Sequence, residues 1–364
     1  MKLIYISPLQ FPASSGMHVY IRELAKRFSE SLKENFLLLV RDSATSDLIG
    51  VNYQSVNFPF MNLRTVFYFF WLPLFIARNR FNSGETVFFA NDPNLLVVLA
   101  VWKFFFGYRL ASDWHQFVKD WRDSFVAGRS DYLITTSLKL KKSIIDSFCV
   151  NETKILAAHG GVNLSENRPD KNTARKILNL SPEKRYVGYM GFFMAAGFEK
   201  GIKTMIEALP CLDSQINLLL VGGKVEEIAE YGKLAEKLGV KDRCVFSGRK
   251  KQEEIAVYES ACDILAIPYP DQPHFRDYGF PMKVYEYIAS GRPIIYSKLE
   301  MAEEIIGGCA TSFIPDNAVD FARAVKEIFS FYPKKEEEAK KAFEKLGMYT
   351  WEKKAEKIID FINK

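Results

Sequence analysis

Short apolar runs alternate with amphipathic stretches along the first 160 residues. Residues 19–32 place apolar side chains at helical spacing with arginine, lysine and glutamate between them, which predicts a helix directly after a Pro/Ser/Gly loop. Continuous apolar strands that alternate with helices are typical of a parallel sheet covered on both faces, so this half predicts one Rossmann-like domain. Its predicted strands are residues 3–7, 36–40, 86–90, 109–113, 132–135 and 155–157.

The second half repeats this α/β pattern. Gly191, Gly222 and Gly248 each close a predicted strand, where the absence of a Cβ lets the backbone pass close to another group. Ligands of open parallel sheets bind beyond the carboxyl ends of the strands, so these glycines predict the binding edge. The predicted strands are residues 185–191, 216–222, 244–248, 264–268, 293–296 and 311–314.

A polar stretch that contains glycine and proline after residue 160 predicts a hinge between the two halves. We therefore expect an N-terminal Rossmann-like domain over residues 1–162, a linker over 163–184 and a C-terminal Rossmann-like domain over 185–345. Residues 346–364 predict a last helix with one apolar face, which we expect to pack back toward the N-terminal domain. A chain of 364 residues with 48% apolar residues is long enough for two hydrophobic cores.

Basic and aromatic residues concentrate in the first half. Residues 1–162 hold 18 Lys+Arg against 13 Asp+Glu, whereas residues 163–364 hold 31 of each, so the first half carries the whole net charge of +5. It could meet an anionic membrane or a phosphorylated acceptor, or it could be a well-filled core with solvated lysines. Residues 66–77 and 95–106 are apolar, but a bilayer span needs about 20 residues. They predict either buried helices or an interfacial contact.

Other features narrow the class of protein. The five cysteines have no paired spacing, so we expect reduced thiols in a cytoplasmic protein, at the inner face of the membrane if such contact occurs. The N-terminus enters a strand pattern at once, unlike a signal peptide. The histidines lack the spacing of a metal site, and no G-x-G-x-x-G follows the first strand as in nicotinamide dehydrogenases. A mild positive charge alone does not indicate nucleic-acid binding.

Six motifs follow one another in the order found in one enzyme family. The first half contains FPASSGMHVYIRELAKRF and SDWHQF, and the second contains GFEKGIKTMIEAL, INLLLVGG, CVFSGRKKQEEIAVYESACDILAIPY and GFPMKVYEYIASGRPII. This ordered set resembles the retaining glycosyltransferases of family 4 (group 1), which have the GT-B fold. The resemblance implies two Rossmann-like domains facing each other across a cleft. The C-terminal domain would bind the nucleotide sugar and the N-terminal domain the acceptor.

The resemblance assigns the nucleotide-sugar donor to residues of the second half. Lys200 matches the lysine that contacts the donor diphosphate, where an ammonium stabilises the leaving group. Glu286 matches the glutamate that holds the ribose hydroxyls with its two acceptor oxygens. Gly191 lies on the same donor-binding edge. The loop before the Glu286 helix would place backbone amides against the donor sugar and phosphate, and it consists of Tyr278, Gly279, Phe280 and Pro281.

On the N-terminal side, His115 at the end of a predicted strand matches the histidine that approaches the donor sugar and the acceptor. A histidine can hydrogen-bond a hydroxyl or share a proton near neutral pH. Asp113 lies two residues before it, and Gly16 and His18 belong to the first loop, which in the family lies against the donor phosphate and the acceptor. No metal is expected, because a lysine and helix amides neutralise the diphosphate. The expected catalytic residues are His115, Lys200 and Glu286.

Two departures from the family pattern bear on the donor. The family has a carboxylate eight positions before the ribose-binding glutamate, whereas this chain has Tyr278 there, with Asp277 one residue off register. The family also has an arginine just after the first strand-end glycine, whereas this chain has Phe192. The missing guanidinium removes a bidentate phosphate contact. Arg249 or Lys283 could supply the charge instead.

These features predict a glycosyltransferase that moves a hexose-type sugar from a UDP- or GDP-sugar to a glycan or lipid-linked acceptor with retention of anomeric configuration. The nucleotide sugar is a co-substrate, and no other cofactor is expected. Two alternatives stay open on sequence grounds. One is a sugar-nucleotide epimerase of the same architecture. The other, prompted by the two departures, is a non-catalytic protein that binds sugar nucleotides or glycans.

Overall fold

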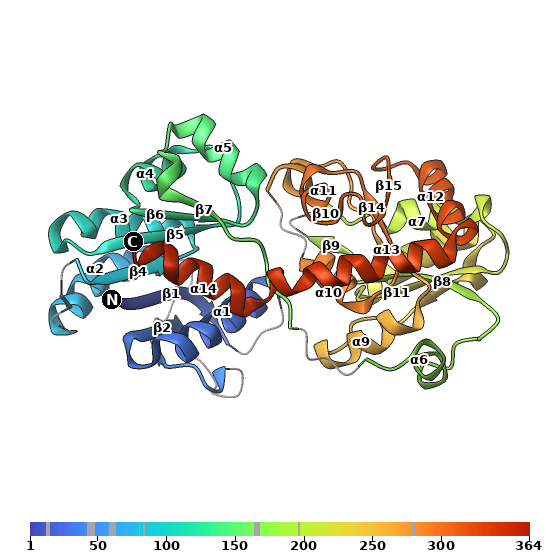
Figure 1. The fold of residues 1–364 in the computed structure, drawn as a ribbon, viewed down its shortest axis with the longest axis horizontal. Helices are drawn as coiled ribbons and strands as arrows, with labels where there is room; N and C mark the ends of the chain where they lie inside the picture. Colours follow the sequence, from blue (N-terminus) through green and yellow to red (C-terminus); the bar gives the residue numbers. More distant parts are fainter. Residues whose placement is uncertain are drawn as a thin grey trace. The chain divides into compact units, whose positions relative to one another are not determined.

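Two compact units make up the chain. Unit 1 comprises residues 1–161 and 349–364, and unit 2 comprises residues 162–348. Figure 1 shows both, coloured along the chain. The side chains of Ala195 and Tyr278 lie outside the description. The computed structural model describes residues 1–11, 15–41, 48–57, 63–79, 81–82, 84–163, 168–195, 197–278 and 282–364.

Unit 1 is built on a seven-stranded sheet with the order β3-β2-β1-β4-β5-β6-β7, in which all neighbours run parallel. The six predicted strands of this half are confirmed. The sequence pattern missed only β3, whose short, polar and largely exposed sequence YQS carries no apolar signal. The strands are β1 (Lys2–Gln10), β2 (Phe36–Arg41), β3 (Tyr53–Ser55), β4 (Thr86–Ala90), β5 (Arg109–Trp114), β6 (Tyr132–Thr135) and β7 (Ile155–Ala157).

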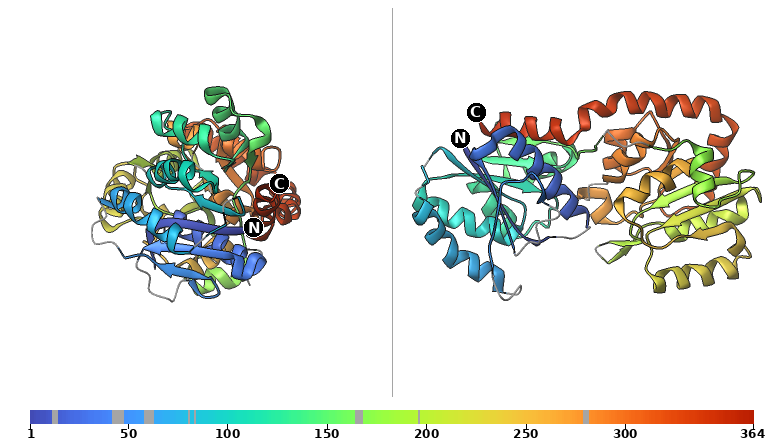
Figure 2. Two further views of the ribbon diagram at one scale, coloured as in Figure 1. Left: turned by 90° about the vertical axis from the view of Figure 1, so that its left-hand side faces the viewer. Right: turned by 90° about the horizontal axis from the view of Figure 1, so that it is seen from below.

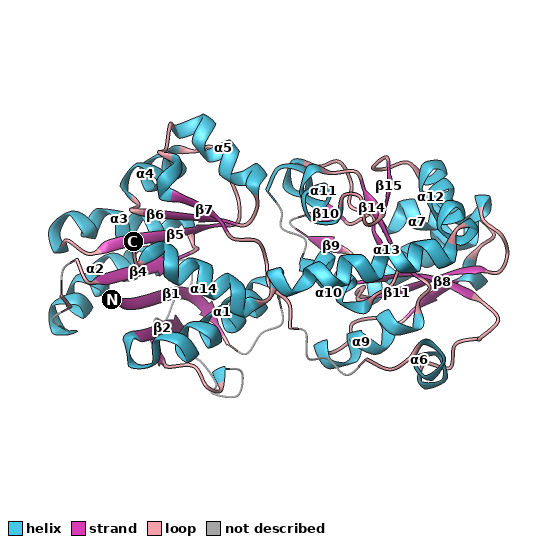
Figure 3. Ribbon diagram, viewed as in Figure 1, coloured by secondary structure: helices cyan, strands magenta, loops and turns pink. Residues whose placement is uncertain are grey.

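Helices surround the sheet of unit 1 (Figure 3). Two of them, α3 after β4 and α4 after the loop that follows β5, begin at an aspartate that caps the helix. The Asp92 carboxylate accepts the backbone N–H of Leu95 at the start of α3, and Asp120 accepts two backbone N–H groups at the start of α4. The helices are α1 (Gly16–Leu32), α2 (Arg64–Asn79), α3 (Pro93–Phe106), α4 (Trp121–Arg129), α5 (Leu138–Phe148) and α14 (Trp351–Ile362).

Unit 2 has a six-stranded parallel sheet with the order β12-β11-β8-β13-β14-β15 and a separate antiparallel pair, β9 (Met194–Ala195) and β10 (Phe198–Glu199). The six predicted strands are confirmed as β8 (Arg185–Met190), β11 (Ile216–Val221), β12 (Cys244–Phe246), β13 (Ile264–Ile267), β14 (Ile294–Ser297) and β15 (Thr311–Phe313). Its helices are α6 (Lys171–Ile177), α7 (Ile202–Ala208), α8 (Val225–Lys237), α9 (Gln252–Ala261), α10 (Met282–Ser290), α11 (Glu300–Ile306), α12 (Ala318–Ser330) and α13 (Tyr332–Glu344).

Helix α6 lies inside the range 163–184, which the sequence pattern assigned to a linker. It belongs to unit 2 because a polar network pins it there. The buried Arg175 guanidinium forms a 2.7 Å ion pair with Asp263 and donates to the Ala261 carbonyl. Lys171 contacts the other oxygen of Asp263 at 3.0 Å, and the backbone N–H of Tyr186 donates to this carboxylate as well. This part of the expected linker is therefore an integral element of unit 2.

Helix α14 returns the end of the chain to unit 1, where it packs against α1 (Figure 2). Its buried face includes Trp351, Ala355, Ile358 and Ile362. The indole of Trp351 lies so close to Gly161 that a Cβ at this glycine would overlap the ring. The residues after Tyr349 thus complete the core of unit 1.

Candidate functional site

Three strand-end glycines of unit 2 lie together at the carboxyl edge of its sheet. The backbone N–H of Gly222 donates to the Gly248 carbonyl at 2.6 Å, and a Cβ at Gly222 would overlap the carbonyl of Gly191. A side chain at Gly222 would push the backbones that follow β8 and β11 apart. The sequence pattern located this edge of the sheet.

Lys200 stands at this edge, just before α7. The next residue, Gly201, has a left-handed φ of 84°, and a Cβ there would overlap the carbonyl oxygen of Pro268, directly after β13. Glycine is therefore required to seat Lys200 against the end of this strand. The ammonium lies 5.6 Å from the centre of the Tyr269 ring and forms no ion pair with any described residue. Burial, together with the charge of Lys283, lowers the pKa of Lys200 to about 8.

Glu286 and Lys283 form an ion pair on α10, with 2.6 Å between Lys283 Nζ and Glu286 Oε2. The second oxygen, Oε1, is 3.5 Å from Gln252 Nε2. Burial raises the pKa of Glu286, but the charge of and hydrogen bond from Lys283 outweigh it, so this pKa lies below its usual range. A Cβ at Gly191 would lie 3.0 Å from Lys283 Cε, which places the pair against the glycine edge. The pair is thus ionised near the ammonium of Lys200.

Two further titratable groups border this cluster. Burial lowers the pKa of His274, and the nearby Lys200 lowers it further. The buried Glu259 forms a 2.6 Å ion pair with Arg168, yet burial raises its pKa to about 7. The charge of Glu286 contributes to this rise. Perturbed pKa values that gather at one edge of a parallel sheet are typical of a functional site.

Arg249 lies near the position of the missing family arginine. Its guanidinium is 4.7 Å from the centre of the Phe192 ring, which is the residue found where the family has an arginine. Arg249 follows Gly248 on the glycine edge and forms no ion pair with another described residue. A positive charge is therefore held beside this position from the neighbouring strand end.

Asp277, the residue one position off the family register, lies in a π-helical turn over His274–Tyr278. A π turn contains more residues than an α-helical turn and so shifts the register of the residues after it. The Asp277 carboxylate forms ion pairs of 3.1 and 3.2 Å with Arg276. Of the predicted loop, the structure describes only the backbone of Tyr278, and Gly279, Phe280 and Pro281 lie outside the described residues.

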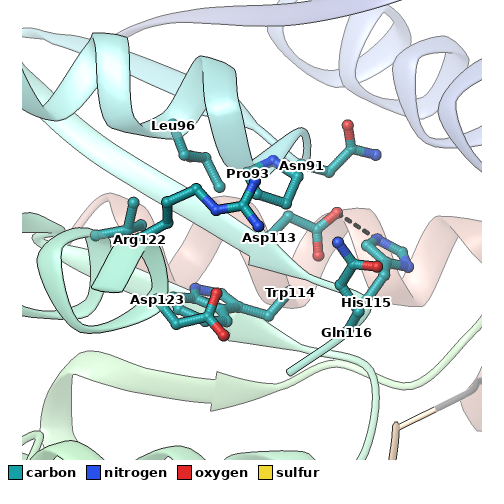
Figure 4. A pocket seen from close by; sticks show the side chains of 10 residues that line it. Asn91, Pro93, Leu96, Asp113, Trp114, His115, Gln116, Arg122 and Asp123 are labelled. Atoms are coloured by element: carbon teal, nitrogen blue, oxygen red, sulfur yellow. Dashed lines mark hydrogen bonds and ion pairs between the residues drawn. The ribbon is translucent and has the colours of Figure 1, made fainter. Parts of the chain in front are cut away.

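Unit 1 contains a small pocket, open to solvent, at the carboxyl end of β5 (Figure 4). His115 lies at its edge, and its Nε2 atom is 3.0 Å from Oδ2 of the buried Asp113. The His115 Nδ1 atom has no partner among the described residues, so it is available to a ligand. The pocket is lined by residues from β5, the following loop and the starts of α3 and α4, among them Asn91, Pro93, Gln116, Arg122 and Asp123.

Charged groups of this pocket are already paired within the protein. Arg122 forms an ion pair with Asp120 and donates to the Asn94 side chain at 2.9 Å. Asp123 accepts the backbone N–H groups of Val118 and Lys119. Burial raises the pKa of Asp123. These charges are therefore compensated within the protein, which favours a neutral ligand over a strongly charged one.

Of the first-loop candidates, His18 is held by the protein itself. Its Nδ1 atom is 2.6 Å from Ser15 Oγ, and its Nε2 atom is 3.2 Å from the Gln10 carbonyl oxygen. Gly16 begins α1. The structure thus gives His18 a place in the turn that starts α1, and His115 is the histidine that faces the pocket.

The motifs did not single out several neighbours of these residues. Gln252 reaches Glu286 from α9, and Tyr269 lies under the Lys200 ammonium. Arg168 and Glu259 pair across 91 positions of sequence. The sequence could have indicated Gln252, because it is the first residue of a helix that follows a strand-end glycine. The other contacts arise only from the tertiary fold.

Residues 170–345 match the family model of glycosyl transferases group 1. This segment, nearly all of unit 2, belongs to the group 1 glycosyl transferases. Curated relatives of this chain include an O-antigen chain mannosyltransferase of Salmonella typhimurium, 24% identical over 55% of this chain and 51% of the relative. Another is a D-inositol 3-phosphate glycosyltransferase of Stackebrandtia nassauensis, 22% identical over 64% of this chain and 54% of the relative. The matched region spans about half the length of these relatives.

Solved structures show that the whole chain has the GT-B fold of two Rossmann-like domains. HepE of Anabaena, crystallised in complex with UDP, superposes with a TM-score of 0.81 at 16% identity, and both chains are covered completely. Sucrose-phosphate synthase of Thermosynechococcus elongatus superposes with a TM-score of 0.79 at 18% identity over 100% of this chain and 98% of the other. The predicted fold class is therefore confirmed, and the match of residues 170–345 confirms the predicted similarity to the group 1 glycosyl transferases.

Proposed function

We propose that this protein transfers a hexose-type sugar, with retention of anomeric configuration and without a metal, from a nucleotide-sugar donor to a glycan or lipid-linked acceptor. The observation that carries the proposal is the cluster at the carboxyl edge of unit 2. There Lys200 offers an ammonium without an ion-pair partner among the described residues, beside the ionised pair of Lys283 and Glu286. A cation free to meet a diphosphate and a carboxylate able to accept ribose hydroxyls are the two groups that a nucleotide diphosphate sugar requires.

In the proposed reaction, unit 2 binds the donor. The bond between the sugar C1 atom and the diphosphate oxygen breaks while a bond forms from C1 to the acceptor oxygen. Lys200 stabilises the charge that develops on the leaving diphosphate, and this diphosphate collects the acceptor proton. Arg249 adds positive charge at the place of the missing family arginine, and Asp277 accepts hydroxyls of the donor sugar.

Unit 1 binds the acceptor in the pocket beside His115. The free Nδ1 atom of His115 and the amides of Asn91 and Gln116 suit hydroxyl groups, and the paired charges of the pocket suit a neutral sugar. His115 orients the acceptor hydroxyl. Hexose donors are supported by the relatives named as mannosyltransferases, and UDP by the Anabaena protein crystallised with UDP and with UDP-glucose.

Calorimetric titration of the protein with UDP, GDP and ADP tests the donor site. We expect one diphosphate to bind. Loss of the ribose contact in Glu286→Ala should weaken its affinity by about 10-fold to 100-fold, the range for a hydrogen bond to a charged group. Glu236→Ala, at an exposed position of α8, is the control and should bind as the wild type does. Absence of binding to all three diphosphates would contradict the proposal.

The same titration includes Arg249→Ala. If Arg249 replaces the missing arginine, this variant should also bind the diphosphate more weakly, and unchanged affinity would show that it does not. Product analysis with and without acceptor then separates the candidate activities. An epimerase would convert the sugar nucleotide without acceptor, and a binding protein would form no product.

We also propose that unit 1 contacts an anionic membrane from the cytoplasmic side, which would bring it to a lipid-linked acceptor. Neighbouring helices α2 and α3 carry an apolar surface consisting of Val66, Phe70, Leu74, Phe104 and Phe105, which are 55–87% exposed. These two helices contain no acidic residue, and their charged side chains are Arg64, Arg78 and Lys103. Arg64 and Lys103 are ion-paired with Asp92 and Asp131, so the exposed apolar face itself is the main support for this contact, as in a helix at a membrane interface.

Two further observations bear on this contact. No described helix is long and apolar enough to cross a membrane. All five cysteines are free thiols, which fits a reducing compartment. The apolar surface is therefore proposed to lie on the bilayer rather than to span it.

Sedimentation with vesicles tests the membrane contact. The wild type should bind phosphatidylglycerol vesicles more tightly than phosphatidylcholine vesicles, and its tryptophan emission should shift to shorter wavelength because Trp102 packs against Phe105. The double variant F70S/F104S should bind at least about tenfold more weakly, since each buried aromatic ring contributes about 1.5–3 kcal/mol. The control is Phe331→Ser in unit 2, an exposed residue outside the surface. If the wild type ignores vesicles, or forms a dimer that the double variant abolishes, the surface serves another purpose.

A further inference from the structure

Lys354 is the charged residue on the buried face of α14, and it is only 3% exposed. Burial of an ammonium is unfavourable unless neighbouring groups compensate it. The side chain donates to two backbone carbonyls, those of Ala158 at 2.7 Å and His159 at 3.1 Å. It makes no ion pair with a described carboxylate. A methionine would fill this space without a charge, so packing alone does not account for a lysine here.

Tyr20 of α1 connects this ammonium to the candidate catalytic histidine. The Lys354 Nζ atom lies 4.7 Å from the centre of the Tyr20 ring. The same ring meets the His115 imidazole in an edge-to-face contact, with 4.4 Å between centroids and an interplanar angle of 88°. Tyr20 also packs edge-to-face on Trp351 of α14. One aromatic ring therefore holds His115 on one side and α14 on the other.

Asp113, the partner of His115, depends on the charges around it. The carboxylate is buried, and its Oδ1 atom lacks a hydrogen bond of normal geometry from the described residues. Burial raises the pKa of Asp113, but the charge of and hydrogen bond from His115, followed by the charge of Lys354 and the Tyr20 hydroxyl, lower it below its usual range. The ammonium from α14 thus helps to keep Asp113 ionised, and an ionised Asp113 accepts the hydrogen bond that orients the His115 ring.

We propose that Lys354 is a positioning residue of the transfer reaction, which holds the Asp113–His115 pair in its working geometry through its charge and through Tyr20. The inference rests on the proposed function, because His115 acts there on the acceptor. The contacts of Lys354 all lie within unit 1, whereas the nucleotide is proposed to bind to unit 2. The C-terminal helix would accordingly affect the catalytic step without affecting donor binding.

The test measures kcat, KM and diphosphate affinity in Lys354→Met. We expect kcat to fall about 10-fold to 100-fold and the diphosphate affinity to stay unchanged. The loss should be smaller than that of a group that itself transfers a proton, which contributes about 10²–10⁴-fold. Lys354→Arg should recover most of the lost rate because it keeps the charge. Lys357→Met, one turn nearer the end of α14 at an exposed position, is the matched control.

The results distinguish a positioning role of Lys354 in catalysis from a purely structural role. A folded Lys354→Met variant with kcat within about threefold of the wild type would overturn the proposal. So would equal losses in Lys354→Met and Lys357→Met. If Lys354→Met does not fold, Tyr20→Leu replaces it, since that variant removes the ring between the ammonium and His115. An unchanged kcat in folded Tyr20→Leu would likewise overturn the proposal. If no diphosphate binds even the wild type, the proposed function fails instead.

Discussion

Lys200→Ala is expected to lower the rate of sugar transfer by about 10²–10³-fold, the loss typical of removing one group that stabilises developing negative charge. Like Arg249, Lys200 is a cation at the sheet edge of unit 2 without an ion-pair partner among the described residues, so its charge is not already neutralised by a carboxylate there. The measurement is the steady-state rate with a saturating nucleotide-sugar donor. The control is Lys203→Ala, whose side chain is 62% exposed and lies on the neighbouring α7.

The pKa of Lys200 adds a pH dependence to this prediction. Burial lowers that pKa to about 8, so the ammonium is charged below pH 8 and loses its proton as the pH rises through this value. The affinity for the diphosphate should therefore fall above pH 8, as followed by calorimetry. Lys200→Arg stays charged and should bind with little change over the same range. A Lys200→Ala variant that transfers sugar at the wild-type rate would remove Lys200 from the mechanism.

The second large effect concerns stability. Arg175→Met should reduce the free energy of unfolding of unit 2 by about 3–5 kcal/mol, because it leaves the buried Asp263 without its closest cation. Urea denaturation followed by circular dichroism measures the change. The control is Lys241→Met, which breaks an exposed ion pair with Glu236 and should change stability by less than about 0.5 kcal/mol.

A double variant separates the ion pair from the packing around it. Arg175→Met combined with Asp263→Leu removes both charges, and apolar replacements of a buried pair are often neutral or stabilising. We expect it to recover most of the lost stability, less the contribution of the Tyr186 N–H and Lys171 contacts to Asp263. If the double variant is less stable than Arg175→Met, the shape of the side chains rather than the unpaired charge explains the effect.

The alternation of apolar runs predicted both sheets because strands buried on two faces need apolar residues at every position. The pattern of apolar residues did not predict helix α6. Its sequence, KNTARKI, is mostly polar, and it is held by the pairing of Arg175 with Asp263, 88 positions apart. Apolar periodicity identifies helices that bury an apolar face. A helix that is held by a buried ion pair need not show this periodicity.

The residues of the candidate site were likewise predicted from the sequence only in part. Family motifs led to Lys200, Glu286 and His115, and the structure places the first two near Lys283 and the third beside Asp113. Motifs carry no record of what packs around them, so Tyr269 was found only in the fold. Lys354 is different, since it lies three residues after Trp351 on the apolar face of the last helix. A charged residue at a core position of a helix is itself a signal.

The chain of unit 1 is interrupted by the whole of unit 2, because residues 349–364 return to it. During synthesis, α14 leaves the ribosome after β1 to β7 and after the whole of unit 2. Unit 2 is continuous in sequence and can complete its core while the end of the chain is still being made. Until α14 has been made, the surface of α1 that packs against it stays uncovered. The core of unit 1 can therefore be completed only after unit 2 has been made, and the Tyr20 ring beside His115 gains its contacts with Trp351 and Lys354 at that point.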